Sequence, residues 1–253
     1  MAVLDLVLHM FPASHYNEKA RWALDWKGLP HRRIPYLPGP HGPQIQRMTG
    51  QTATPVLEMG GRAIAGSAQI IDALEQAFPQ RALYPADPVQ RERALAVQTR
   101  FDDEVGPAVR TVVFSVLLHE LTYLRDVFAS GQPAVKRVIY RALLPLVKPV
   151  IAKANGVTPD NVARAFARTE QALEEAAQLV GSSGQIAGDA FSVADLSVAA
   201  LLMPLAPPAH PDTQRPAHVP ARVQELYARF EKHAALQWLS AQYAKHRPAP
   251  CTV

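Results

Sequence analysis

Apolar and polar positions along the first 35 residues predict a strand, a helix and a second strand. Residues Val3 to His9 alternate weakly and predict a short strand. From His15 to Lys27 the apolar positions follow helical spacing, and Gly28 is a typical helix stop. The segment His31 to Pro35 predicts the second strand. The buried face of the helix is expected at Ala20, Ala23 and Leu24.

The pattern from Ala53 to Ala73 predicts a hairpin followed by a helix. Pro55 has no N–H for a sheet ladder, so it belongs at the start of a strand, and X-Pro bonds are where cis peptides occur. Gly60-Gly61 predicts the tight turn into a second strand, Arg62 to Ala65. A helix then opens at Ser67 and runs to about Phe78, while a loop from Pro38 to Pro43 and a short helix precede the hairpin.

Beyond residue 87 the pattern is helical almost throughout. Three helix starts carry a capping residue: Asp87 before Pro88, Thr158 before Pro159, and Ser192, whose partner Asp195 completes a capping box. Phe191 stands where a hydrophobic staple against Leu196 is expected. Prolines gathered between residues 204 and 220 predict loop.

Composition narrows the class of protein. The chain has 253 residues, of which 48% are hydrophobic and 19% charged, as in ordinary globular proteins. Its formal net charge of +4 is too small and dispersed to indicate a nucleic-acid partner. The lone cysteine, Cys251, allows no internal disulfide and no cysteine-rich metal site, which fits a cytoplasmic setting. We also expect no signal peptide, no membrane span and no metal site.

The Thr-Pro hairpin with its following helix, together with the string GDAFSVADLSVAALL, resembles the cytosolic glutathione S-transferase superfamily. The resemblance implies a thioredoxin-like α/β domain over residues 1–80, a linker over 81–87 and an all-α domain over 88–245. Residues 131–157 are longer than the family's usual helical hairpin and are expected to form an insertion, and residues 246–253 a tail.

The same resemblance places Ser14, in the string SHYNEKAR, at the reactive position. There a hydroxyl would donate a hydrogen bond to the sulfur of glutathione and favour the thiolate, aided by the helix N-terminus. Ser14 is alternatively only a helix cap, and Tyr16 is the substitute hydroxyl. Asn17 stands where a redox pair would have its second thiol, which excludes dithiol exchange by this loop.

Glutathione-binding residues also follow from the resemblance. The main chain of Thr54, beside Pro55, would pair with the cysteinyl amide, and Ser67 would bind the γ-glutamyl carboxylate at a helix N-terminus. Gly66 departs from the family, which usually has Glu, Asp or Gln there to hold the ammonium. His41 and Gln51 are candidates for the glycyl carboxylate, although simple exposure also explains His41.

Residues 127–159 contain no Asp or Glu but carry five cations among apolar residues. Pro145 and Pro149 are expected to break this basic amphipathic pattern. We favour a core helix with a solvated basic face over contact of residues 136–153 with a membrane. We further expect this insertion to wall a pocket for a hydrophobic substrate.

The resemblance therefore implies an enzyme that adds the thiolate of glutathione, its co-substrate, to a small hydrophobic electrophile. It also implies a homodimer and a role in detoxification. A non-catalytic binding or regulatory protein on the same fold, and a transferase for another low-molecular-weight thiol, are the alternatives.

Overall fold

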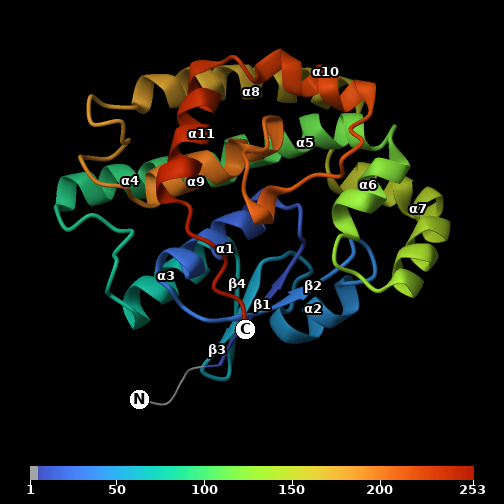
Figure 1. Ribbon diagram of the computed structural model, residues 1–253, viewed down its shortest axis with the longest axis horizontal. Helices are drawn as coiled ribbons and strands as arrows, with labels where there is room; N and C mark the ends of the chain where they lie inside the picture. Colours follow the sequence, from blue (N-terminus) through green and yellow to red (C-terminus); the bar gives the residue numbers. More distant parts are fainter. Residues whose placement is uncertain (1–4) are drawn as a thin grey trace.

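A computed structural model describes residues 5–253 (Figure 1). The first domain is built in the order β1 (Leu6–Met10), α1 (His15–Trp26), β2 (Arg32–Pro35), α2 (Gly42–Thr49), β3 (Val56–Met59), β4 (Arg62–Ala65) and α3 (Ser67–Ala77). Its four strands lie in the order β2-β1-β3-β4, with β1 and β2 parallel and the other pairs antiparallel. The expected thioredoxin-like domain is confirmed.

Local differences from the expected elements are small. The first strand begins at Leu6 and ends at Met10, one residue later than expected, while Val3 lies outside the described residues. The loop from Pro38 ends earlier than expected, because α2 already starts at Gly42 with Pro43 in its first turn. Proline suits that position, where a helix has no use for its N–H.

The rest of the chain is helical. Asp87, Thr158 and Ser192 each accept a backbone N–H at the helix start predicted for them, and Asp195 completes the capping box. A π-helical turn, Phe101–Val105, joins the first two helices of this domain. Its α-helices are α4 (Pro88–Arg100), α5 (Gly106–Leu117), α6 (Leu121–Phe128), α7 (Ala134–Ala154), α8 (Pro159–Leu179), α9 (Val193–Leu202), α10 (Ala221–Phe230) and α11 (Ala234–His246).

Aromatic side chains join the two domains. Helix α1 lies between the sheet and the helical domain and packs on α9 (Figure 1). The ring of Trp22 stacks on Phe191 at 5.6 Å and lies 4.5 Å from Tyr243, and Trp26 lies 4.8 Å from Phe191. Both tryptophans of α1 therefore pack against the helical domain.

The last residues return to the first domain. Thr252 forms a parallel bridge with His31 beside β2, and the N–H of Cys251 donates to Asp25 at 2.7 Å. The side chain of Arg247, just after α11, is buried against α1. The segment 246–253 therefore holds the sheet against the helical domain.

Helix α7 corrects two expectations. It continues through Pro145 and Pro149, because both lie on its exposed side, where water can satisfy the carbonyls that lose a backbone partner. It is also not a core helix, because only Tyr140, Leu144 and Ile151 of this helix are buried. The expected solvated basic face is present at Lys136, Arg137 and Arg141, but large apolar side chains are exposed as well.

Candidate active site

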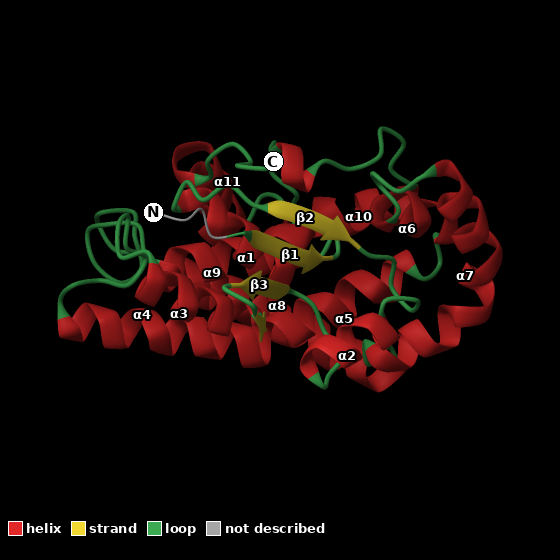
Figure 2. Ribbon diagram, turned by 90° about the horizontal axis from the view of Figure 1, so that it is seen from below, coloured by secondary structure: helices red, strands yellow, loops and turns green. Residues whose placement is uncertain are grey.

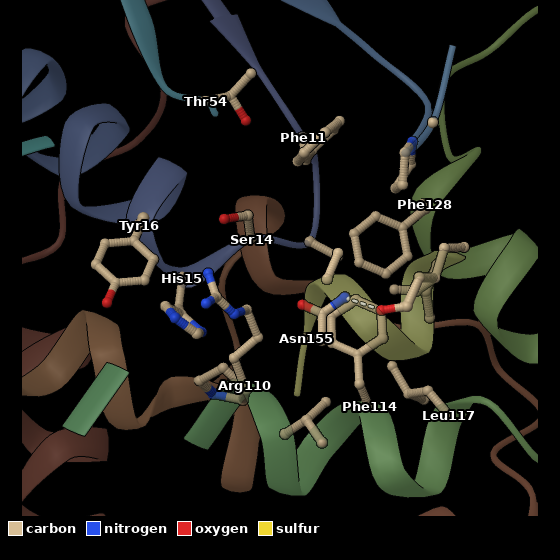
Figure 3. A pocket seen from close by; sticks show the side chains of 18 of the residues that line it. Phe11, Ser14, His15, Tyr16, Thr54, Arg110, Phe114, Leu117, Phe128 and Asn155 are labelled. Carbon is tan, nitrogen blue, oxygen red and sulfur yellow. Dashed lines mark hydrogen bonds between the residues drawn. The ribbon is translucent and has the colours of Figure 1, made fainter. Parts of the chain in front are cut away.

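A cavity of ≈ 530 Å³ opens between the two domains. The first domain contributes the loop before α1 and the segment 52–54, and the second contributes α5, α6, α7 and α10. Most of its lining is apolar, including Phe11, Phe114, Leu117 and Phe128 (Figure 3). Val147 and Ile151 also line it, so the 131–157 segment does form part of its wall.

Ser14 lies at the cavity wall and at the N-terminus of α1. Its Oγ accepts the N–H of Asn17 at 3.5 Å, so Ser14 is the N-cap of the helix. A hydroxyl has one proton to donate besides two lone pairs, and that proton has no acceptor among residues 5–253. Capping and donation to a ligand are therefore compatible roles of one hydroxyl.

A hydrogen bond connects this helix start to the hairpin. The Asn17 side chain, fully buried, donates from Nδ2 to Oγ1 of Thr54 at 3.2 Å. Thr54 lines the cavity, and neither its N–H nor its C=O has a partner among the described residues. The Thr54–Pro55 peptide bond is cis, as expected from the sequence. The main chain of Thr54 is thus free to pair with a ligand beside Ser14.

Tyr16 uses its hydroxyl elsewhere. The O–H donates to the backbone carbonyl of Asp102 in the π-helical turn, and the ring points away from Ser14 (Figure 3). Burial, assisted by the negative charge of Asp102, raises the pKa of Tyr16 well above its ordinary value. The alternative hydroxyl is therefore engaged in holding the two domains together.

His41 and Gln51 are likewise engaged within the first domain. Nδ1 of His41 accepts the N–H of Gly39 at 3.2 Å, and its Nε2 donates to the carbonyl of Thr52 at 2.9 Å. The Gln51 carboxamide bonds to Thr49 and to both backbone groups of Ala53. These contacts shape the loop that leads to Thr54, and they leave neither side chain a free donor for a carboxylate.

Gly66 and Ser67 lie where β4 meets α3, next to Pro55. The N–H of Gly66 donates to the carbonyl of Pro55 at 2.9 Å, and Ser67 is the first residue of the helix. Gly66 has φ 95°, a conformation that L side chains rarely adopt, so any side chain at this position would be strained. A Cβ there would meet Oε1 of Gln69. The carboxamide of Gln69 therefore occupies the neighbourhood of the missing acid.

Two arginines in the cavity carry no recognisable signal in the sequence. Arg110 on α5 extends its guanidinium toward Ser14 (Figure 3), and its buried Nε has no hydrogen-bond partner among residues 5–253. Arg215 also lines the cavity and donates only to backbone carbonyls and to the sulfur of Met203. No Asp or Glu of the described part of the chain lines it. Only the folded chain brings these cations beside Ser14.

His15 lies beside Arg110 (Figure 3). Burial, together with the positive charges of Arg110 and Lys19, lowers the pKa of His15 to about 3. The imidazole is therefore neutral at neutral pH, and it adds no positive charge to that of Arg110.

Two kinds of feature are absent from residues 5–253. No group of three or more His, Cys, Asp or Glu side chains is placed to hold a metal ion there. None of the helices described has the length and the apolar composition that crossing a membrane requires.

A thioredoxin-like domain followed by an all-helical domain is the architecture of glutathione S-transferases. Residues 8–82 match the model of the glutathione S-transferase N-terminal domain. The first domain of the chain therefore belongs to the glutathione S-transferase N-terminal domain family.

Curated relatives match part of the chain. It is 33% identical to a glutathione S-transferase of Pseudomonas putida over 88 residues, which are 35% of this chain and 40% of that protein. It is 27% identical to a maleylpyruvate isomerase of a Ralstonia species over 131 residues, 51% of this chain and 58% of that protein. The chain thus spans about half the length of these relatives.

Solved structures match nearly the whole fold. The beta-etherase LigF of a Sphingobium strain superposes with a TM-score of 0.62 and 18% identity, covering 94% of this chain and 99% of that one. A theta class glutathione S-transferase of Xanthomonas axonopodis, solved with glutathione bound, superposes with a TM-score of 0.57 and 16% identity. The match covers 92% of this chain and 96% of that one. These likenesses support the two-domain architecture.

Proposed function

We propose that the protein is a glutathione S-transferase-like enzyme that joins the thiolate of glutathione to a small apolar electrophile. The observation that carries this proposal is the placement of Ser14. Its hydroxyl lies on the cavity wall with a proton to donate, at a helix N-terminus that Asn17 ties to Thr54.

Three groups favour the thiolate over the thiol at this position. The Ser14 O–H would donate to the sulfur, the N-terminus of α1 contributes partial positive charge, and the guanidinium of Arg110 adds a full charge. The thiol proton leaves to solvent. The sulfur then forms a bond to carbon as the leaving group departs with its electron pair. The protein contributes by lowering the pKa of the thiol and by orienting the two reactants.

The free main-chain groups of Thr54 would pair with the cysteinyl amide of glutathione, as a short added strand. Ser67 and the N-terminus of α3 would bind the γ-glutamyl carboxylate. We assign the ammonium contact to Oε1 of Gln69, which lies next to Gly66. A neutral amide oxygen then accepts the ammonium hydrogen bond that the family's usual side chain at position 66 would accept.

The cavity favours an electrophile that is apolar but carries an anionic group. Arg110 is a cation in a mostly apolar cavity, and its buried Nε has no partner among the described residues. An unpaired buried donor is costly, so a ligand carboxylate that pairs with it gains correspondingly in affinity. Arg215 supplies a second cation in the same cavity.

A second candidate reaction is the thiol-dependent isomerisation of an anionic substrate. The matched relative named maleylpyruvate isomerase acts on a carboxylate, and the two arginines suit one. A non-catalytic binding protein and a transferase for a different thiol remain the alternatives from the sequence. The resemblance to the family also supports a homodimer, which sedimentation would test.

The decisive experiment measures the thiolate directly. Bound glutathione should show thiolate absorbance near neutral pH in the wild type, and Ser14→Ala should raise the thiol pKa and lower kcat/KM about 10-fold to 100-fold. Tyr16→Phe should keep the thiol pKa of the wild type. The proposal is wrong if glutathione does not bind, or if Tyr16→Phe has the larger effect. Thermal shifts with glutathione, cysteine and γ-glutamylcysteine would identify another thiol.

A further inference from the structure

Helix α7 exposes an unusual number of large apolar side chains. Of the eight such residues exposed in the described part of the chain, six lie on α7, and their exposed fractions run from 40% to 75%. They recur every three or four residues, so they form one stripe along the helix. The stripe consists of Val135, Val138, Ile139, Leu143, Leu146 and Val150.

The opposite side of α7 is firmly packed. Tyr140, Leu144 and Ile151 are buried in a small apolar cluster with residues of α5 and α6. The orientation of the helix about its own axis is therefore fixed. Its apolar stripe faces outward, and Val150 at the end of the stripe also lines the cavity. Both ribbon views place α7 at the edge of the molecule, beyond α6 (Figures 1 and 2).

Cations border this stripe on both sides. At 3.6 residues per turn, Arg137, Arg141 and Lys148 fall between the stripe and the buried face on one side, and Lys136 falls at the other edge of the stripe. Lys153, also exposed, follows in line with the stripe. Arg137 approaches Asp126 at 3.9 Å, whereas Lys136, Arg141 and Lys148 have no ion-pair partner among residues 5–253. No acidic residue occurs between residues 127 and 159 to balance them.

We propose that α7 docks on the surface of an anionic lipid bilayer, lying in the plane of the interface. An interface of this kind presents apolar chains and negative headgroups in one plane, which matches an apolar stripe with cationic borders. A second copy of the chain fits less well, because two such helices would bring like charges together without any acid between them. The cations also distinguish α7 from a membrane-spanning helix, which would carry few charged residues.

The test uses the full chain with vesicles of phosphatidylcholine, alone or mixed equally with phosphatidylglycerol. Cosedimentation should occur with the anionic vesicles and fall steeply between about 0.05 and 0.5 M salt. The combined variant Arg137→Gln, Arg141→Gln and Lys148→Gln should lower the partition coefficient at least about tenfold. The pair Val138→Ser and Leu146→Ser should lower it similarly, because less apolar area enters the interface.

Matched controls lie elsewhere on the surface. Arg164→Gln on α8 removes an exposed cation, and Val89→Ser on α4 removes an apolar side chain that is 74% exposed. Both should bind vesicles like the wild type, and near-ultraviolet circular dichroism should show that every variant is folded. The proposal is overturned if anionic vesicles do not bind the protein or if the α7 variants bind as the controls do. It is also overturned if Val138→Ser and Leu146→Ser abolish self-association in the absence of lipid.

Discussion

Arg247 donates from Nε to the carboxylate of Glu18 at 2.8 Å, and neither side chain is exposed to solvent. The two residues are 229 positions apart, so the contact joins the end of the chain to α1. Arg247 also pairs with Asp25 and Asp212, and Glu18 also pairs with Arg21. This buried network holds the helix whose first turn contains the candidate catalytic site.

Removing the Arg247 guanidinium should destabilise the protein strongly. Arg247→Met leaves buried carboxylates without their partner, a change that costs about 3–5 kcal/mol in comparable pairs. Urea unfolding gives the change in the free energy of unfolding. Arg229→Gln breaks the exposed pair with Glu170 and should cost no more than about 1 kcal/mol. Equal effects of the two substitutions would contradict this account of the network.

The same network predicts loss of stability in acid. Burial alone would raise the pKa of Glu18, but Arg247 and Arg21 outweigh it and hold that pKa below its ordinary value of 4.5. Burial is likewise outweighed at Asp212, where Arg21, Arg33 and Arg247 lower the pKa. The unfolded chain then binds more protons than the folded one as the pH falls, so stability present above about pH 4.5 is lost below it.

This prediction is checked by measuring the free energy of unfolding at several pH values between 7 and 3. The contribution of the network to the acid-induced fall should be smaller in Arg247→Met, whose carboxylates lack the cation that lowers their pKa. A steeper fall in that variant would show that other groups control the acid sensitivity.

Arg110 should discriminate between charged and neutral electrophiles. With para-(bromomethyl)benzoate, a glutathione thioether forms and bromide leaves, and Arg110→Met should lower kcat/KM at least about tenfold because the carboxylate loses its partner. With the methyl ester of the same compound the fall should be smaller, because only the effect of Arg110 on the thiolate is then lost. Equal losses for the two electrophiles would mean that Arg110 acts on the thiolate alone.

Gln69 should contribute to glutathione affinity. Gln69→Ala removes the amide oxygen assigned to the ammonium, and a hydrogen bond to a charged group corresponds to roughly a tenfold or larger rise in Kd. Calorimetric titration with glutathione measures it. Gln76→Ala on the same helix is the matched control, since its amide pairs with Asp72 instead. Unchanged affinity in Gln69→Ala would leave the ammonium without an assigned partner.

Local signals predicted the hairpin of the first domain and three helix starts of the second. Proline and glycine positions fixed the hairpin around Gly60-Gly61, and side-chain caps at Asp87, Thr158 and Ser192 marked the starts of three helices. These features depend on residues close in sequence, which is why they could be recognised without the fold.

Contacts between distant segments escaped prediction. Arg110 lies about 100 residues after Ser14, and only the packing of α5 on the first domain brings them together. The orientation of α7 was misjudged because an amphipathic pattern shows two faces without showing which one is buried. Gln69 was overlooked because its relation to Gly66 depends on the φ angle of that glycine.

Helix α7 turns Ile151 toward the cavity and Leu146 toward the outside, little more than one helical turn apart. An outer contact that shifts this helix would therefore link the two binding equilibria thermodynamically. If a contact at the outer face changes the affinity of the cavity for its ligand by some factor, ligand binding in the cavity must change the affinity of the outer contact by the same factor.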